Sequence, residues 1–221
     1  METNKLKDQN AVVFFDRFST EFDTLYDHQR GVVMRWLDSK FRNGIYERYV
    51  KTFEALGNLE GKTVLDIGCG SGPYIKEALE RNAKLVTGLD PAAGMLKISA
   101  QRLNNATYNN RFSLVEGLFP NTEVYEHDFA IVMGVFDYVD DKEAFMSQLY
   151  RVVKEKAIAS FPSKHWFRTP LRKFRYKLRN CPLWFYDENQ IRDLAHKSGF
   201  SGAEISKIKG AGQDYVVVLI K

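Results

Sequence analysis

The stretch VLDIGCGSGPY, residues 64–74, most constrains what this chain can fold into. An apolar, β-branched run ends in an acid, three glycines fall within five residues, and Pro73 suits the first turn of a helix, where its missing N–H costs nothing. A strand, a glycine turn and a helix bring backbone N–H groups and the positive end of the helix to one point. The stretch therefore predicts a strand–loop–helix unit that holds a ligand at its loop.

The residues after Gly57 repeat this alternation of short β-branched runs and helical windows, which is typical of a parallel α/β sheet. We expect strands over residues 63–67, 84–89, 112–116, 129–133, 156–161, 203–207 and 215–220, and helices over residues 73–82, 92–103, 141–153 and 187–198. The connector GAGQD between the last two strands is too short for a crossover helix. That pair of strands should therefore be antiparallel.

Two segments differ from this alternation. Residues 11–57 have apolar residues three and four apart, which predicts helices that stop at Gly57, so residues 1–57 should form an N-terminal helical cover. Residues 163–186 are a basic, aromatic insertion between the fifth strand and the next helix. We expect the cover and the core at residues 58–221 to form one structural domain.

The net charge of +4 is concentrated in that insertion, which contains seven Lys or Arg and no acid, so the basicity describes one surface. The two cysteines, Cys69 and Cys181, lie in unlike contexts and indicate neither a disulfide framework nor a zinc site. No segment has the pattern of a signal peptide or the apolar length of a membrane span. We expect a reduced, cytoplasmic protein with no metal site.

The residues around the glycine loop distinguish three kinds of ligand. Pro73 stands where a dinucleotide fingerprint has its third glycine, and no Gly-Lys-Ser/Thr follows, so the P-loop interpretation fails. Asp90 ends the second expected strand 18 residues after Gly72, where a carboxylate can accept both ribose hydroxyls of a nucleoside. Asp66 would repel a pyrophosphate but suits a cofactor with an amino group and a sulfonium. These signs favour S-adenosylmethionine over NAD.

Three motifs in this order, VLDIGCGSGPY, VTGLDPAAGML and FAIVMGVFDYVDD, resemble those of the class I S-adenosylmethionine-dependent methyltransferases. The resemblance covers roughly residues 11–221 and identifies the cofactor better than the substrate. It implies an α/β fold with a Rossmann-like, seven-stranded, mostly parallel sheet. The last strand would be antiparallel, and helices would cover both faces.

The resemblance also implies cofactor-binding residues. The loop around the methionine part would comprise Asp66, Gly68, Cys69, Gly70 and Gly72, with Cys69 as a small filler and not a nucleophile. Asp90 would hold the ribose hydroxyls. The remaining cofactor contacts would come from Tyr26, which closes over the cofactor, from Pro91, Met95 and Leu96 near the ribose and adenine, from Glu116 and Gly117 at the adenine, and from Gly134 after the fourth strand. An equal alternative for Met95 and Leu96 is plain helix-to-sheet core.

Candidate catalytic residues follow from the expectation that ligands bind at the carboxyl ends of the strands. The family's small-molecule O-methylating members often carry Glu-His where this chain has Asp137-Tyr138. Asp137 would accept a proton or bind a metal, or it caps the loop; Tyr138 would orient the substrate, or it packs over the cofactor. His165, after the fifth strand, is the best placed histidine for a base, although a lone histidine beside Trp166 is more often a packed loop residue. His127 should face solvent at the opposite edge.

The function that we expect is methyl transfer from S-adenosylmethionine to a small-molecule acceptor at oxygen. The insertion at residues 163–186 would be a lid over an anionic or amphiphilic acceptor, and it also allows peripheral contact with a membrane surface or a solvated basic face with no ligand. A nucleic-acid methyltransferase is the first alternative, disfavoured because no Asn-Pro-Pro-Tyr-type motif follows the fourth strand. A catalytically silent cofactor-binding partner subunit is the second. The oligomeric state stays open.

Overall fold

A computed structural model describes residues 32–163, 184–208 and 214–221, with side chains from residue 44 onward. Several sequence predictions lie outside the described residues. These are Tyr26, His165, Cys181 and most of the basic insertion.

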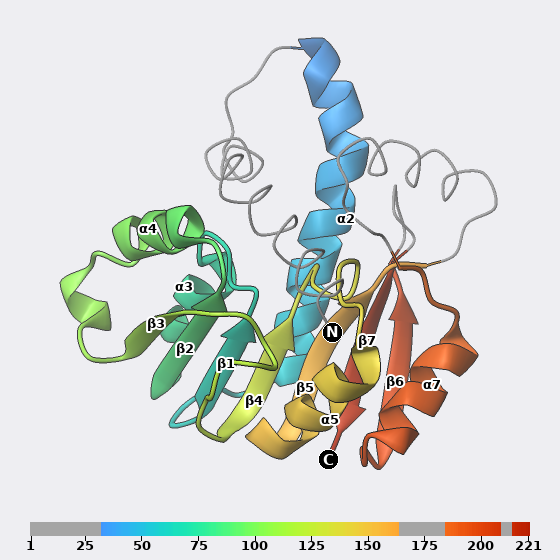
Figure 1. The fold of residues 1–221 in the computed structure, drawn as a ribbon. Helices are drawn as coiled ribbons and strands as arrows, with labels where there is room; N and C mark the ends of the chain where they lie inside the picture. The colour runs from blue at the N-terminus through green and yellow to red at the C-terminus, as the bar shows by residue number, and fades with distance from the viewer. Residues whose placement is uncertain (1–31, 164–183, 209–213) are drawn as a thin grey trace.

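The fold is built on one seven-stranded sheet in the order β3-β2-β1-β4-β5-β7-β6 (Figure 1). Its strands are β1 (Thr63–Ile67), β2 (Leu85–Asp90), β3 (Phe112–Glu116), β4 (His127–Val132), β5 (Val153–Phe161), β6 (Gly202–Lys207) and β7 (Tyr215–Ile220). The first five strands pair in parallel, and β7 pairs antiparallel with both β5 and β6. The structure confirms the expected sheet and its antiparallel final pair.

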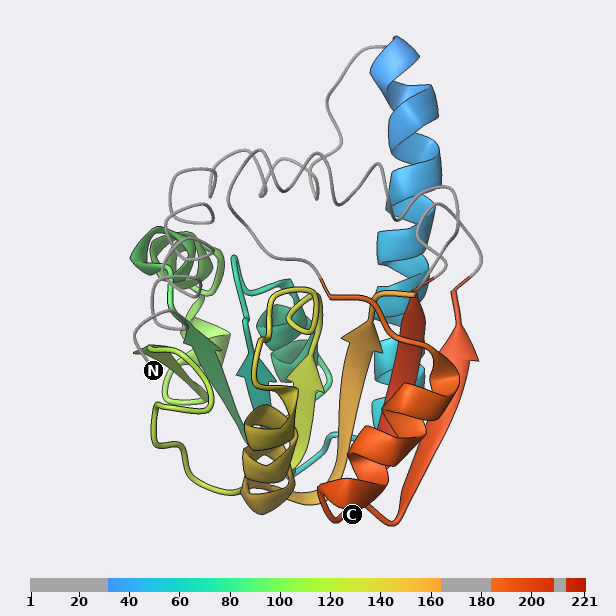
Figure 2. The ribbon, with the colours of Figure 1, turned by 45° about the vertical axis from the view of Figure 1, so that its right-hand side comes forward.

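Helices cover both faces of this sheet. They are α2 (Val32–Leu56), α3 (Pro73–Glu80), α4 (Ala93–Arg102), the short 3₁₀ helix η2 (Ala106–Tyr108), α5 (Lys142–Val152) and α7 (Glu188–Lys197). The apolar faces of α2 and α3 pack in one buried cluster, and those of α5 and α7 pack in another. Figure 2 shows α5 and α7 in front of the strands, with α2 behind them.

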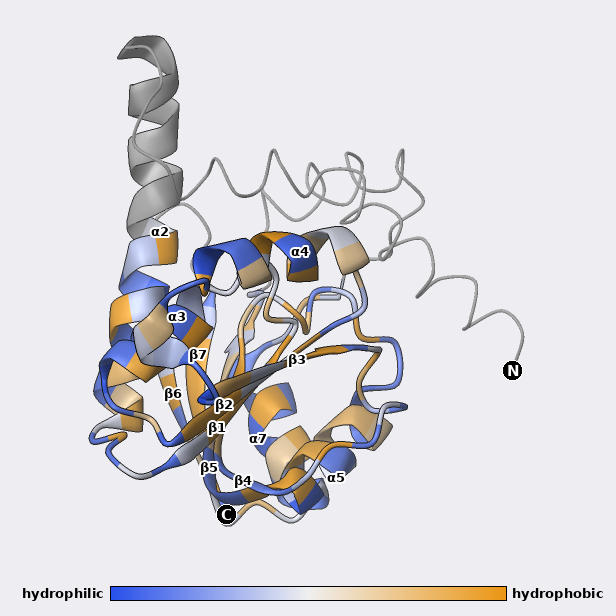
Figure 3. Cartoon of the chain, turned by 90° about the vertical axis from the view of Figure 1, so that its left-hand side faces the viewer, coloured by the Kyte–Doolittle hydropathy of each residue, from blue (hydrophilic) through white to orange (hydrophobic). Residues whose placement is uncertain are grey.

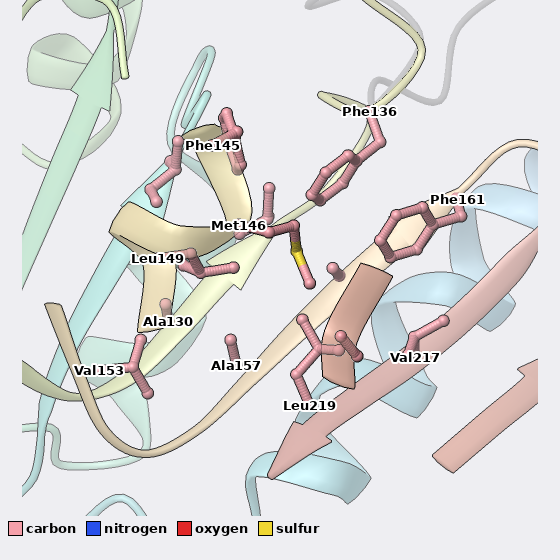
Figure 4. Close-up of a cluster of buried hydrophobic side chains, with 14 of the residues drawn as sticks. Ala130, Phe136, Phe145, Met146, Leu149, Val153, Ala157, Phe161, Val217 and Leu219 are labelled. Carbon is pink, nitrogen blue, oxygen red and sulfur yellow. The ribbon is translucent and has the colours of Figure 1, made fainter. Parts of the chain in front are cut away.

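The apolar residues are distributed as this layering requires. Figure 3 shows hydrophobic residues along the strands and hydrophilic residues on the loops and outer helix faces. On the α5 side, Phe136 stacks on Phe161 with ring centroids 4.1 Å apart and contacts Phe145 edge-on (Figure 4). All three rings are fully buried. Since Phe136 belongs to the loop after β4, this aromatic cluster fixes that loop to the sheet.

Local signals set most element ends. Gly57, with φ 72°, follows α2, and its N–H donates to the Phe53 carbonyl, as the predicted helix stop requires. Asp187 caps α7 in a capping box with Gln190. Most boundaries differ from the prediction by one or two residues, and the largest difference is at β5, which begins at Val153, three residues before the predicted strand, because no loop separates it from the end of α5 at Val152. The division into a cover at residues 1–57 and a core at residues 58–221 stays a prediction.

Candidate active site

The glycine loop follows β1 and is tied to the end of β2. The N–H groups of Gly68 and Cys69 both donate to the Leu89 carbonyl, at 2.7 and 3.2 Å. Gly68, Gly70 and Gly72 have φ values of 71°, 54° and 77°, a region that side chains disfavour. The loop therefore needs glycine for its backbone path.

The same glycines differ in what surrounds them. A Cβ at Gly68 would lie 2.5 Å from Val135 Cγ2, and one at Gly72 would lie 2.3 Å from Ser99 Oγ. At Gly70 no described atom lies within 4 Å of that position. The loop is thus packed at both ends and open at its centre, where a ligand can approach the backbone.

Asp66 lies directly below this loop, on β1. Its side chain is 1% exposed, and its Oδ2 atom has no hydrogen-bond partner among the described residues. Burial, and next the charge of Asp90, raise the pKa of this carboxyl to about 8. A buried oxygen without a donor is costly in an empty site. It fits a site that receives a cationic ligand.

Asp90 joins the glycine loop to the start of α4. Its Oδ2 accepts the Gly70 N–H at 2.9 Å, and its Oδ1 accepts the Ala92 N–H at 2.8 Å. Burial raises its pKa, while these two backbone donors lower it. Because each carboxylate oxygen has two lone pairs, both oxygens keep acceptor capacity for a further donor.

The other predicted cofactor residues lie around this edge in different environments. Pro91 is half-buried beside Asp90, and Met95 is buried on α4, as the core alternative also requires. Glu116, at the end of β3, is exposed, and the Gly117 N–H donates to the Asp90 carbonyl at 3.1 Å. Cys69 is buried, and burial raises the pKa of its thiol well above its ordinary value, as expected for a filler and not for a nucleophile.

The loop after β4 carries the predicted acceptor-side residues. The Gly134 N–H donates to Ser160 Oγ at 2.8 Å, which ties this loop to β5. Asp137 is buried, and its carbonyl accepts the Trp184 N–H at 3.0 Å; Tyr138 is half-buried. The Tyr186 hydroxyl donates to the Phe136 carbonyl at 3.3 Å, and burial and the nearby Asp137 raise the pKa of Tyr186. The structure thus brings both predicted residues to the carboxyl edge.

Two arginines at this edge were missed by the sequence interpretation. The Nε atom of Arg48, on α2, is buried without a partner among the described residues, and its Nη1 lies 3.5 Å from the Cβ position of Gly134. Arg102, at the end of α4, donates to the Ser71 carbonyl and to Ser71 Oγ, the latter at 2.8 Å. Neither is part of a motif, so only the spatial contact across elements reveals it.

His127 is not solvent-facing, and that prediction was wrong. It is 3% exposed, with its ring nitrogens 2.8 Å from the Tyr125 carbonyl and 2.9 Å from Thr87 Oγ1. Burial lowers the pKa of the imidazole. Its location at the opposite edge is as expected, since it begins β4. The hydroxyl of Thr87, 40 residues away, lets the neutral ring be buried.

The described residues contain no group of three or more His, Cys, Asp or Glu side chains arranged to hold a metal ion. They also contain no helix long and apolar enough to cross a membrane.

Comparisons with known proteins find methyltransferases. Residues 64–156 match a family model described as a methyltransferase domain. A phosphoethanolamine N-methyltransferase 2 of Caenorhabditis elegans is 25% identical over 71% of this chain, which covers 37% of that relative. A ubiquinone biosynthesis O-methyltransferase of Rhodopseudomonas palustris is 30% identical over 54% of this chain and 47% of its own length. The chain thus spans less than half of these curated relatives.

The likeness to one solved structure extends over nearly the whole chain. The magnesium protoporphyrin IX methyltransferase of Synechocystis, crystallised with S-adenosylhomocysteine, has a TM-score of 0.75 at 22% identity, covering 97% of this chain and 100% of that chain. This likeness concerns the fold. Residues 64–156 thus match a methyltransferase domain, and the chain as a whole has the fold of a methyltransferase of known structure.

Proposed function

We propose that this protein transfers a methyl group from S-adenosylmethionine to a small-molecule acceptor, at an oxygen atom. The observation that carries the proposal is the buried oxygen of Asp66, which has no hydrogen-bond partner among the described residues and lies beneath a loop that is open at Gly70. When bound, the cofactor supplies a methyl group already activated by its sulfonium. The protein's task is then to position the reactants, exclude water and remove a proton from a hydroxyl acceptor.

The cofactor-side residues match the charges of this ligand. Asp66 would lie opposite a cationic part of the methionine moiety, and the guanidinium of the half-buried Arg48, beside Gly134, would hold its carboxylate. Asp90 would accept the ribose hydroxyls with the lone pairs that its backbone donors leave free. Met95, Glu116 and Gly117 would border the adenine, and Tyr26 would cover the cofactor. A carboxylate and a guanidinium at one edge of the sheet suit a zwitterion.

The acceptor-side assignments are part of the same proposal. Asp137, Tyr138 and His165 are the residues proposed to orient the acceptor and take its proton. The lid role of the insertion is supported by its described ends: Ser163 forms a parallel bridge with Tyr186, and Trp184 bonds to Asp137. Both ends of the insertion therefore meet at the carboxyl edge of the sheet.

Transfer to nitrogen is the competing outcome, because the N-methyltransferase relative matches a larger share of this chain than the O-methyltransferase does. Transfer to nucleic acid and a silent partner subunit are the further alternatives. Methyl-label transfer from S-adenosylmethionine into a lysate fractionated into lipids, small metabolites and nucleic acids distinguishes all four. Label in a small metabolite, carried on oxygen by mass spectrometry of the product, supports the proposal. Label on nitrogen or in nucleic acid, or none, contradicts it.

Cofactor binding is tested separately by calorimetry with S-adenosylmethionine. We expect Arg48→Gln to weaken binding about tenfold, the effect of losing one charge-assisted contact. Lys51→Gln, a change of the same kind three residues along the same helix, serves as the matched control and should bind as the wild type does. Equal affinities of the two variants would remove Arg48 from the proposed site.

A further inference from the structure

Asp66 and Asp90 are two acids of one site with very different hydrogen bonding. Both oxygens of Asp90 accept backbone N–H groups. Asp66, by contrast, has a buried Oδ2 that accepts none among the described residues. A protonated carboxyl tolerates such an environment far better than a carboxylate does, because desolvation penalises the charged form.

The groups around Asp66 also oppose a charge there. In the sheet register its partners are Gly88 on β2 and Ile131 on β4, neither of which can titrate. The titratable groups that act with it are Asp90, at the end of β2, and the buried thiol of Cys69. Among the described residues, none of the causes that shift this carboxyl is a cation. Burial and Asp90 together raise its pKa to about 8.

We propose that Asp66 holds a proton in the empty site and loses it to solvent when the cationic part of the methyl donor binds, so that donor binding releases one proton. The inference rests on the proposed function. In this step the O–H bond of Asp66 breaks, the proton passes to a buffer base, and the carboxylate that remains lies opposite the ligand cation. That cation is either the ammonium, which S-adenosylmethionine shares with S-adenosylhomocysteine, or the sulfonium, which only the donor has.

The coupling makes donor affinity depend on pH. Where Asp66 is protonated in the empty site, the proton competes with the ligand cation. Each rise of one pH unit lowers the proton concentration tenfold, so donor affinity increases about tenfold per pH unit. Above the pKa of Asp66 the increase levels off. Affinity should therefore rise steeply from pH 6 to 7 and flatten beyond pH 8.

Calorimetry of the full chain with S-adenosylmethionine tests this directly. The titration is run at pH 7 in buffers of different ionisation enthalpy, which gives the number of protons released. We expect close to one proton for the wild type and a clear loss of that release in Asp66→Asn. Asp128→Asn, an acid on β4 that accepts from Thr63, is the control and should release as the wild type does. A titration with S-adenosylhomocysteine distinguishes the sources: release with both ligands indicates the ammonium, and release with the donor alone indicates the sulfonium.

Three results would overturn the inference. They are wild-type binding without proton release, equal release by Asp66→Asn, and an affinity that stays flat between pH 6 and 8. The last measurement needs only the wild type, so it decides the matter even if the variant does not fold. Because the ligand's own amino group titrates identically with both proteins, their difference isolates Asp66. Binding without release leaves the proposed function standing, whereas no binding at any pH overturns both.

Discussion

Asp66 occupies a position where an ionised carboxyl is unstable without a partner. Such a residue destabilises the ligand-free protein, and residues that lower stability are common at functional sites. The folded-state pKa of about 8 lies above the unfolded value of about 3.9, so the unfolded chain loses this proton first as pH rises. The penalty therefore grows between about pH 4 and pH 8.

Asp66→Asn should remove that penalty. We expect the ligand-free variant to be more stable than the wild type at pH 8, on the order of 4 kcal/mol or roughly 10 °C in Tm. At pH 4, close to the unfolded pKa, most of the penalty is gone and the difference should nearly vanish. Thermal unfolding of both proteins across this range measures it. A constant difference at all pH values would show that Asp66 is ionised in the empty site.

A second prediction at the residue scale concerns Gly72, where two causes of damage can be separated. Gly72→Ala combines an unfavourable φ of 77° with a Cβ 2.3 Å from Ser99 Oγ, and we expect a loss of about 3 kcal/mol. Gly61→Ala has a φ of 73° but no described atom within 4 Å, so strain alone should cost about 1 kcal/mol. Denaturant unfolding of the pair measures the difference. If both variants lost equally, close packing of the loop against α4 would be refuted.

At the scale of elements, α4 connects Asp90, the ribose-side acid, with the glycine loop. It begins just after Asp90, and its last residue, Arg102, reaches back to Ser71 in the glycine loop. The helix therefore fixes the loop relative to the ribose-side acid. Arg102 is a positioning residue, since it acts on the backbone of the loop.

Arg102→Met should free the glycine loop while keeping the apolar stem of the side chain. We expect donor affinity to fall about tenfold, with a smaller change in Tm than Gly72→Ala produces. Ser71→Ala removes the hydroxyl contact but leaves the carbonyl, so its affinity should lie between those of Arg102→Met and the wild type. Calorimetry with S-adenosylmethionine ranks the affinities of the three proteins. If Arg102→Met bound as tightly as the wild type, the contact of Arg102 with Ser71 would not position the loop for the donor.

The same scale shows what could be predicted from sequence. The glycine loop, the stop at Gly57 and the cap at Asp187 depend on residues within a few positions, so their patterns are visible along the chain. Arg48 and Arg102 depend on contacts between elements far apart in sequence. Nothing in the local pattern of α2 or α4 marks these arginines as different from solvent-facing ones. The antiparallel final pair was accessible because the connector GAGQD is too short for a crossover helix.

At the scale of the whole molecule, a buried histidine connects two strands at the edge opposite the cofactor loop. His127 begins β4 and bonds to Thr87 on β2, two strands that are not neighbours because β1 lies between them. Its pKa is lowered by burial, so its contribution to stability is complete above its unfolded pKa of about 6.5 and is lost as pH falls through the lower folded value.

His127→Gln should reduce the fall in unfolding free energy at low pH, since an amide can still hydrogen-bond but does not titrate. We expect the variant to be less stable than the wild type at pH 8, by about 1 kcal/mol for imperfect hydrogen bonding, and the gap to close towards pH 5. Urea unfolding at each pH measures both curves. Parallel curves from pH 8 to pH 5 would exclude His127 as the source of acid sensitivity.

The position of β7 has a consequence for how the protein is made. This strand lies between β5 and β6, yet its residues follow both in sequence. During synthesis β6 leaves the ribosome with no neighbour in the sheet, and β5 has one unpaired edge, until residues 215–220 emerge. The cofactor edge at β1, β2 and β4 can form much earlier. A nascent chain can thus form its ligand-binding loop while β6 and one edge of β5 are still unpaired.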